Sequence, residues 1–153
     1  MDQTTAQESG LSRAARILLC DDSASERSVL GLFLRRAGYT VDEVPDGDAA
    51  LLHLKNRQVD LLLLDLHMPQ KDGFGVLSYV QEHRRSLPVI LLSGMSPDDI
   101  QHKMHYLKSQ ELPPLLIKPI DPERLLEIME LHLAGELPTI PEQVEDAHRS
   151  DQV

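Results

Sequence analysis

The chain has 153 residues, 41% of them hydrophobic, which predicts one domain with a proper core and leaves no room for a second. A formal net charge of −10 argues against direct nucleic-acid binding, because proteins that bind the phosphate backbone concentrate Lys and Arg on one face. The single cysteine, Cys20, excludes an internal disulfide, and the sequence contains no signal-like or membrane-spanning run, so we expect a cytoplasmic protein.

The chain begins with a polar segment, residues 1–14, that predicts a flexible leader. Arg16–Cys20 is a short apolar run typical of a β-strand. Ser23 followed three residues later by Glu26 matches a capping box at the start of a helix that ends near Gly38. The predicted apolar face of this helix consists of Val29, Leu30, Phe33, Leu34 and Ala37.

Strands and helices continue to alternate along the rest of the chain. The segment 39–44 carries β-forming residues and predicts a strand, as do the apolar runs at 61–64, 88–92 and 115–117. Four further helices are expected after these strands, with the apolar faces Ala49, Ala50, Leu51 and Leu54; Val76, Leu77 and Val80; Ile100, Met104 and Leu107; and Leu125, Leu126, Ile128, Met129 and Leu133. Residues 136–153 are acidic, contain two prolines and predict a solvated tail, so the folded domain is expected at 15–135.

Five alternations of strand and helix predict an α/β fold with a five-stranded parallel sheet, wrapped by five helices on its two faces. The four leucines at 61–64 do not alternate with polar residues, which indicates a strand buried on both faces in the middle of that sheet. Asp65 follows them directly. The turn residues Pro69, Asp72 and Gly73 then stop the strand and start a helix, so we expect the Asp65 carboxylate at the rim of a loop, within reach of solvent.

Polar or charged residues that can bind ligands or react follow four of the five predicted strands. In a doubly wound sheet of order 2-1-3-4-5 they all meet at the carboxyl edge: Asp21, Asp22, Asp65, Ser93 and Lys118. Three neighbouring carboxylates repel one another and need compensation, which Mg²⁺ and the Lys118 ammonium would supply. A carboxylate not consumed by the metal can attack phosphorus, and Asp65 is the candidate nucleophile, with Lys118 and Ser93 contacting phosphoryl oxygens.

These motifs resemble the receiver domain of two-component response regulators over roughly Ala15 to Ala134. The resemblance is carried by the acid pair, by Asp65 with Met68-Pro69 and Asp72-Gly73 after it, by Ser93-Gly94 and by Lys118-Pro119. It implies a flavodoxin-like receiver fold, often with a cis Lys-Pro bond, that catalyses only its own phosphorylation and dephosphorylation. The implied roles are Asp65 as phosphoacceptor, Ser93 and Lys118 as contacts of the phosphoryl group, and Asp21, Asp22, Asp65 and the backbone carbonyl of His67 as Mg²⁺ ligands.

The same resemblance implies the partners. The phosphoryl donor would be a sensor histidine kinase or a histidine phosphotransfer protein, and a downstream protein would receive the signal, without direct nucleic-acid binding and without a membrane span. We therefore expect a stand-alone single-domain response regulator in a phosphorelay.

Three features depart from the usual receiver pattern. Leu115 stands where receivers carry a switch aromatic, three residues before the Lys-Pro pair, and the loop at 109–114 is longer and stiffer than usual. His67 lies two residues after Asp65, a position from which a side chain influences hydrolysis of the acyl phosphate. The alternative that follows from Leu115 and the altered loop is a receiver-fold interaction module that binds partners without a phosphorylation switch.

Two other classes fit less well. A phosphatase of the haloacid-dehalogenase type needs its nucleophile after the first strand and an acid two residues later, where this chain has Ser23 or Ala24. A flavodoxin-like flavin carrier needs a Ser/Thr/Gly phosphate loop after the first strand and aromatic residues around the ring, whereas this chain has two carboxylates there and only 3% aromatic residues.

Overall fold

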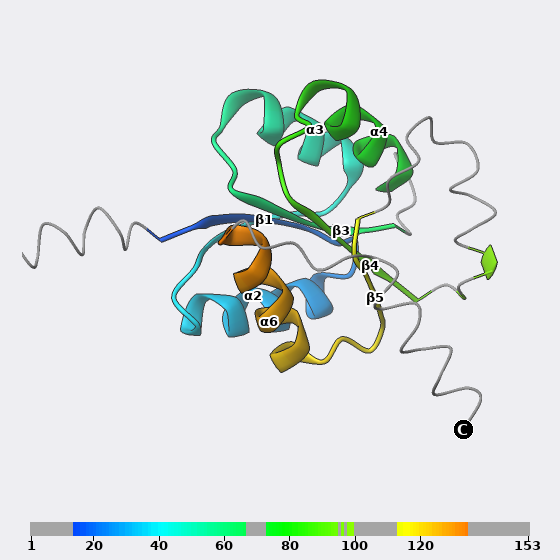
Figure 1. The fold of residues 1–153 in the computed structure, drawn as a ribbon. Coiled ribbons are helices and arrows are strands. Elements are labelled where there is room, and N and C mark those ends of the chain that lie inside the picture. Colours follow the sequence, from blue (N-terminus) through cyan, green and yellow to red (C-terminus); the bar gives the residue numbers. More distant parts are fainter. Residues whose placement is uncertain (1–13, 67–72, 95, 97, 100–112, 135–153) are drawn as a thin grey trace, which may run out of the picture.

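The computed structural model describes residues 14–66, 73–94, 96, 98–99 and 113–134. Within them, five strands form one parallel sheet of order β2-β1-β3-β4-β5, as Figure 1 shows. The predicted strand order 2-1-3-4-5 is therefore confirmed. The strands are β1 (Arg16–Cys20), β2 (Thr40–Val44), β3 (Leu61–Asp65), β4 (Val89–Ser93) and β5 (Leu115–Ile117).

The described residues contain four of the five predicted helices, arranged in two layers. α3 (Gly47–Asn56) and α4 (Gly73–His83) lie on one face of the sheet, and α2 (Ala24–Arg36) and α6 (Pro122–Leu133) lie on the other (Figure 1). The remaining predicted helix, with Ile100, Met104 and Leu107 on its apolar face, lies almost wholly outside the described residues. At its start the backbone N–H of Asp99 donates to Ser96 Oγ at 3.2 Å, as an N-cap requires.

The centre of the sheet separates the hydrophobic core into two parts. Every residue of β3 and β4 is buried, and the four leucines at 61–64 have no exposed surface, so the prediction of a two-faced buried strand is confirmed. Leu62 and Leu64 pack with apolar residues of α3 and α4, whereas Leu61 and Leu63 pack with those of α2 and α6. Packing on both faces thus holds β3 and β4 in the middle of the sheet, with Asp65 and Ser93 as their last residues.

Helix α2 begins where the sequence predicts, but one residue that was predicted on its inward face is exposed to solvent. Ser23 Oγ accepts the backbone N–H of Glu26 at 3.3 Å, so the predicted N-cap is confirmed, and Gly38 ends the helix region with a φ of 104° that favours glycine. Leu34 is buried, but Val29 is 70% exposed, so its place on the inward face was predicted wrongly. The other half of the capping box is also absent, because the Ser23 N–H donates to Asp21 Oδ1 at 2.9 Å instead.

Residues 1–13 and 135–153 lie outside the described residues, so the leader, the tail and the helix stop at Gly135 remain predictions. Among the helices that the structure describes, none combines the length and apolar character needed to cross a bilayer.

Candidate functional site

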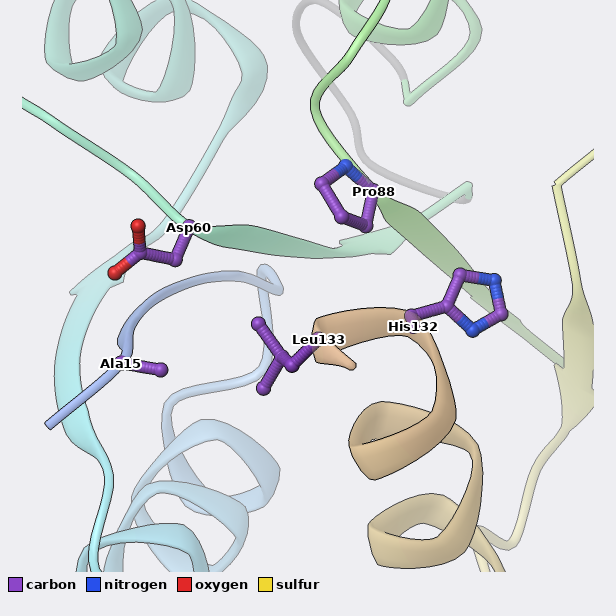
Figure 2. Close-up of a pocket in the computed structure, with 5 residues that line it drawn as sticks. All are labelled: Ala15, Asp60, Pro88, His132 and Leu133. Carbon is purple, nitrogen blue, oxygen red and sulfur yellow. The ribbon is translucent and has the colours of Figure 1, made fainter. Parts of the chain in front are cut away.

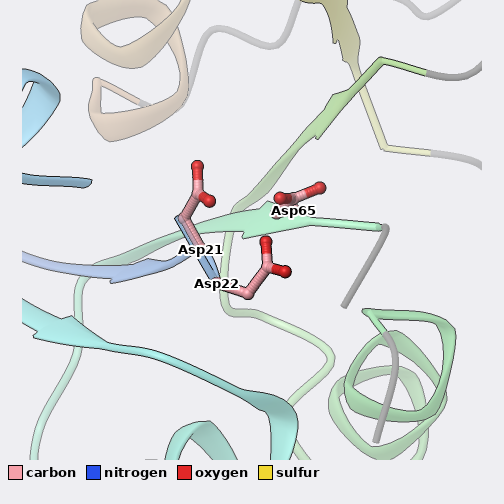
Figure 3. Close-up of side chains that lie close together, drawn as sticks. All are labelled: Asp21, Asp22 and Asp65. Atoms are coloured by element: carbon pink, nitrogen blue, oxygen red, sulfur yellow. The ribbon is translucent and has the colours of Figure 1, made fainter. Parts of the chain in front are cut away.

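Three carboxylates meet at the carboxyl edge of the sheet. Asp21 directly follows β1 and Asp65 is the last residue of β3, and these neighbouring strands pair with Cys20 opposite Leu64. One ligand oxygen each of Asp21, Asp22 and Asp65 lie within 4.8 Å of one another, and Figure 3 shows the three side chains gathered at the ends of these strands. Asp21 and Asp65 are each 2% exposed, whereas Asp22 is exposed.

The Asp65 carboxylate is more deeply buried than the sequence predicts. We expected it at a solvent-accessible rim, but Asp65 is only 2% exposed and its carboxylate is paired with the Lys118 ammonium. Helix α4 also begins directly against the backbone at the end of β3. A Cβ at Gly73 would overlap the backbone carbonyl oxygen of Asp65 and crowd Leu66 Cα, so only glycine allows this approach. The N–H of Gly73 donates to the Leu66 carbonyl at 3.3 Å and holds the helix start in place. The exposed Asp22 is thus the solvent-facing member of the acidic cluster.

The Lys118 ammonium lies among the carboxylates. Its Nζ is 3.1 Å from Asp65 Oδ2 and 3.2 Å from Asp21 Oδ2, so it forms ion pairs with both buried acids. The third and shortest contact, 2.8 Å, is to Glu26 Oε1 in the first turn of α2. The structure therefore places an ammonium beside Asp65, where a phosphoryl group on that residue would lie.

Burial lowers the pKa of the Lys118 ammonium, but the hydrogen bond with Glu26 and the charges of Asp65 and Asp21 raise it more. The net shift is upward from the ordinary value, so Lys118 is charged at neutral pH. One ammonium still leaves negative charge at a site with three clustered carboxylates. Hard oxygen donors with two buried members and one exposed member fit Mg²⁺, which retains waters beside a few carboxylates.

Ser93 ends β4 next to this cluster. Its side chain is fully buried, its backbone carbonyl accepts the Lys118 N–H at 2.8 Å, and Asp65 on the adjacent strand pairs with Leu92. The Lys118-Pro119 peptide bond is cis, as the resemblance to receivers implies. His67 and the residues up to Asp72 lie outside the described residues, so a metal ligand at the His67 carbonyl remains a prediction.

Two residues of α2, Glu26 and Arg27, contact the site although their sequence positions predicted no role there. Glu26 was interpreted only as part of a capping box. Arg27 donates from Nη1 to the Asp21 backbone carbonyl at 2.7 Å and lies 3.5 Å from Glu43, which fixes the loop that carries the acid pair. The signal was present in the sequence, because the first turn of a helix that follows an acid pair lies at the same sheet edge as that pair.

A shallow cavity of about 300 Å³ lies at the opposite, amino-terminal edge of the sheet (Figure 2). It contains none of the predicted site residues. It is lined by Ala15, Asp60, Pro88, His132 and Leu133.

The fold and the site together define a doubly wound α/β module with three clustered carboxylates and a lysine at the carboxyl edge of its sheet. The sequence model of the family described as "Response regulator receiver domain" matches residues 17–130. The chain belongs to this family, whose members act in two-component signalling.

Curated relatives support this assignment over most of the domain. The chain is 37% identical over 94 residues to the transcriptional regulatory protein ResD of Bacillus subtilis, covering 61% of this chain and 35% of ResD. It is 30% identical over 144 residues to the transcription factor SKN7 of Saccharomyces cerevisiae, covering 93% of this chain and 22% of SKN7. It spans 11–35% of the length of eight curated relatives that it matches.

Two solved structures match this chain over almost their own full length. A signal receiver domain of an HD domain-containing protein from Pseudomonas fluorescens superposes with a TM-score of 0.72 and 30% identity, covering 81% of this chain and 98% of that one. The chemotaxis protein CheY4 of Vibrio cholerae superposes with a TM-score of 0.67 and 28% identity, covering 76% of this chain and 97% of that one.

Proposed function

We propose that this receiver domain accepts a phosphoryl group on Asp65 and transmits the signal through protein contacts. The observation that carries the proposal is the position of the Asp65 carboxylate, at the end of a buried strand, 3.1 Å from the Lys118 ammonium and clustered with Asp21 and Asp22. Phosphoryl transfer requires mainly positioning and charge compensation, and this arrangement offers both.

In the proposed reaction an Asp65 carboxylate oxygen attacks the phosphorus of a phosphohistidine. The new O–P bond forms as the N–P bond breaks, and the imidazole nitrogen of the donor keeps the electron pair of that bond. Lys118 neutralises charge on the transferred group, and Ser93 donates a hydrogen bond to one of its oxygens. The added group carries nearly two negative charges and favours the conformation in which these side chains contact it.

Asp21, Asp22 and Asp65 would hold Mg²⁺, with the His67 carbonyl as a further ligand. When bound, the ion would neutralise charge on the transferring phosphoryl oxygens. The chain itself contributes three carboxylates in one cluster, of which that of Asp22 is exposed to solvent. Since two of these acids are buried, folding already brings them together for the cation.

The proposed donor is a sensor histidine kinase or a histidine phosphotransfer protein. One curated relative, 27% identical over 111 residues, is the CAI-1 autoinducer sensor kinase/phosphatase CqsS of Vibrio cholerae, and several others are transcriptional regulatory proteins. Sequences similar to this receiver domain thus occur in a sensor kinase as well as in transcriptional regulators. The acidic net charge of this chain favours a protein as its downstream target rather than nucleic acid.

A receiver-fold interaction module without a phosphorylation switch is the second candidate function. Leu115 takes the place of the switch aromatic and is partly buried against the core cluster that includes residues of β3, β4 and α4. A packed leucine has no ring to move between an outer and an inner position. Leu115 therefore favours a module that binds its partners without the usual phosphorylation-driven switch.

The test is an intact-mass spectrum after incubation with acetyl phosphate, with and without Mg²⁺. We expect the mass of one phosphoryl group to be gained only when Mg²⁺ is present. If acetyl phosphate and a panel of purified histidine kinases both fail to label the chain, the proposed phosphoacceptor function is wrong and the unswitched module is favoured.

A further inference from the structure

Glu26 forms the shortest of the three contacts of the Lys118 ammonium. Its Oε1 lies 2.8 Å from Nζ, compared with 3.1 Å for Asp65 and 3.2 Å for Asp21. Glu26 belongs to α2, 92 residues away in the chain, and is not one of the three clustered acids. A local role in capping α2 does not explain this contact, because the helix cap uses only the backbone N–H of Glu26.

An ammonium group has three N–H donors, and here three carboxylates surround it. A phosphoryl oxygen that arrives at Asp65 needs one of these donors. The three partners are not equally easy to release. The side chains of Asp21 and Asp65 are 2% and 3% exposed, whereas that of Glu26 is 56% exposed and regains water when it leaves.

The geometry points to Glu26 as a positioning residue that occupies Lys118 in the unphosphorylated protein and exchanges places with the incoming phosphoryl group. This inference rests on the proposed function and adds a regulator of its rate. Glu26 acts in two ways with the same sign: its carboxylate competes for the ammonium, and its charge repels a phosphoryl dianion. The residue therefore slows phosphorylation of Asp65.

The test is the rate of phosphorylation by acetyl phosphate in E26Q, at a Mg²⁺ concentration that saturates each protein. A neutral amide oxygen is a weaker acceptor than a carboxylate, so the ammonium is released more easily. We expect a rate about two- to fivefold above wild type, the factor that corresponds to one exposed ion pair. The ratio of the two rates should fall toward one at 1 M salt, where the Debye length is about 3 Å.

E127Q is the matched control, because Glu127 is an exposed glutamate on α6 and the substitution makes the same change in net charge. Its rate should equal that of wild type. A readout without metal or phosphoryl donor is the exchange of the Lys118 Nζ protons with water, measured by NMR. We expect exchange several-fold faster in E26Q than in wild type or E127Q, because one of its three acceptors is weakened.

Three outcomes overturn the inference. An unchanged or slower rate in E26Q would show that Glu26 does not compete for Lys118, with the proposed function intact. An equal acceleration in E127Q would reduce the effect to net charge alone. Failure of the wild-type chain to accept any phosphoryl group would remove the proposed function and this inference together.

Discussion

The two edges of the sheet hold their acidic side chains in different ways. At the amino-terminal edge, beside the cavity in Figure 2, the half-buried Asp60 accepts the backbone N–H of Arg16 at 2.7 Å. At the carboxyl edge Asp21 and Asp65 are buried together and both depend on the Lys118 ammonium. An acid bonded to a backbone amide extends the hydrogen bonding of the sheet, whereas clustered acids repel one another and favour the binding of a cation between them.

The largest expected effect comes from making the same Asp-to-Asn substitution at each edge of the sheet. D65N should abolish phosphorylation, because the amide oxygen is not a nucleophile, while D60N should be labelled like wild type. Both substitutions keep an acceptor oxygen and remove one charge. The measurement is the intact mass after incubation with acetyl phosphate and Mg²⁺, with circular dichroism to verify folding. Labelling that survives in D65N would exclude Asp65 as the acceptor.

Removal of the Lys118 cation tests whether the carboxyl edge depends on it for stability. K118M leaves two buried carboxylates without their ion pair, so we expect the free energy of unfolding at pH 7 to fall by about 3 kcal/mol, as for other broken buried pairs. Addition of Mg²⁺ should recover part of this loss, since the ion binds the folded state.

The matched control for K118M is K55M on α3. Lys55 Nζ lies 5.7 Å from the centre of the Tyr79 ring, an exposed cation–π contact whose loss should cost about 0.5–1 kcal/mol. Urea titrations with and without Mg²⁺ measure both variants. Equal losses for the two substitutions would mean that the ion pairs at the carboxyl edge contribute no special stability.

A smaller effect is expected from the close approach of α4 to β3. G73A places a methyl group against the Asp65 carbonyl, so we expect a loss of about 1–3 kcal/mol from overpacking. G94A is its control, because a Cβ at the exposed Gly94 meets no atom within 4 Å. Thermal unfolding compares the two variants, and a G73A protein as stable as G94A would show that the helix start can move without cost.

The smallest effect concerns Cys20, which lies just before the acid pair. Burial, followed by the charges of Asp65, Asp46 and Asp21, raises the pKa of its thiol in the folded state. The unfolded chain therefore loses the proton first, near the ordinary value of 9.0. The contribution of Cys20 to stability is complete below pH 9 and is lost as the pH rises, by at most about 1.4 kcal/mol per pH unit.

Urea unfolding at pH 8, 9 and 10 measures this loss, and C20A should have a flatter profile over that range. Tyr39 and Lys118 also have raised pKa values, but their ordinary values of 10.0 and 10.5 place their effects at higher pH. A wild-type profile as flat as that of C20A would mean that the thiol is not shielded from water in the folded protein.

Local patterns predicted the fold well because the central strands β1, β3 and β4 are mostly apolar and turn residues follow several of the strands. The leucine run at 61–64, the Ser23 cap and the order of the sheet all agree with the structure. Periodicity alone misplaced Val29, because the helix face that packs is decided by the neighbours of α2 and not by the helix itself. The helix predicted from Ser96 stays untested beyond its first turn.

The meeting of the acids and Lys118 at one edge of the sheet was also predictable from the sequence, because parallel strands align their ends. Local sequence patterns could not reveal how deeply Asp65 is buried, because burial depends on packing between segments that are far apart in the chain, such as those of Asp65 and Lys118. The sequence pattern also predicted the wrong partner for the Glu26 carboxylate, which contacts Lys118 and not the backbone N–H of Ser23. A capping box is a local rule, whereas the partly buried Lys118 ammonium, 92 residues away in the chain, offers the carboxylate a charged partner.

The contacts of Lys118 join segments that are far apart in the chain: 53 residues separate it from Asp65 and 97 from Asp21. Such contacts form only after the intervening chain has been ordered, and Asp21 and Asp65 repel each other until the lysine is in place. We therefore expect this arrangement of side chains to be completed late in folding. A partly folded chain would lack it, so the proposed phosphoryl transfer would also depend on the complete fold of the domain.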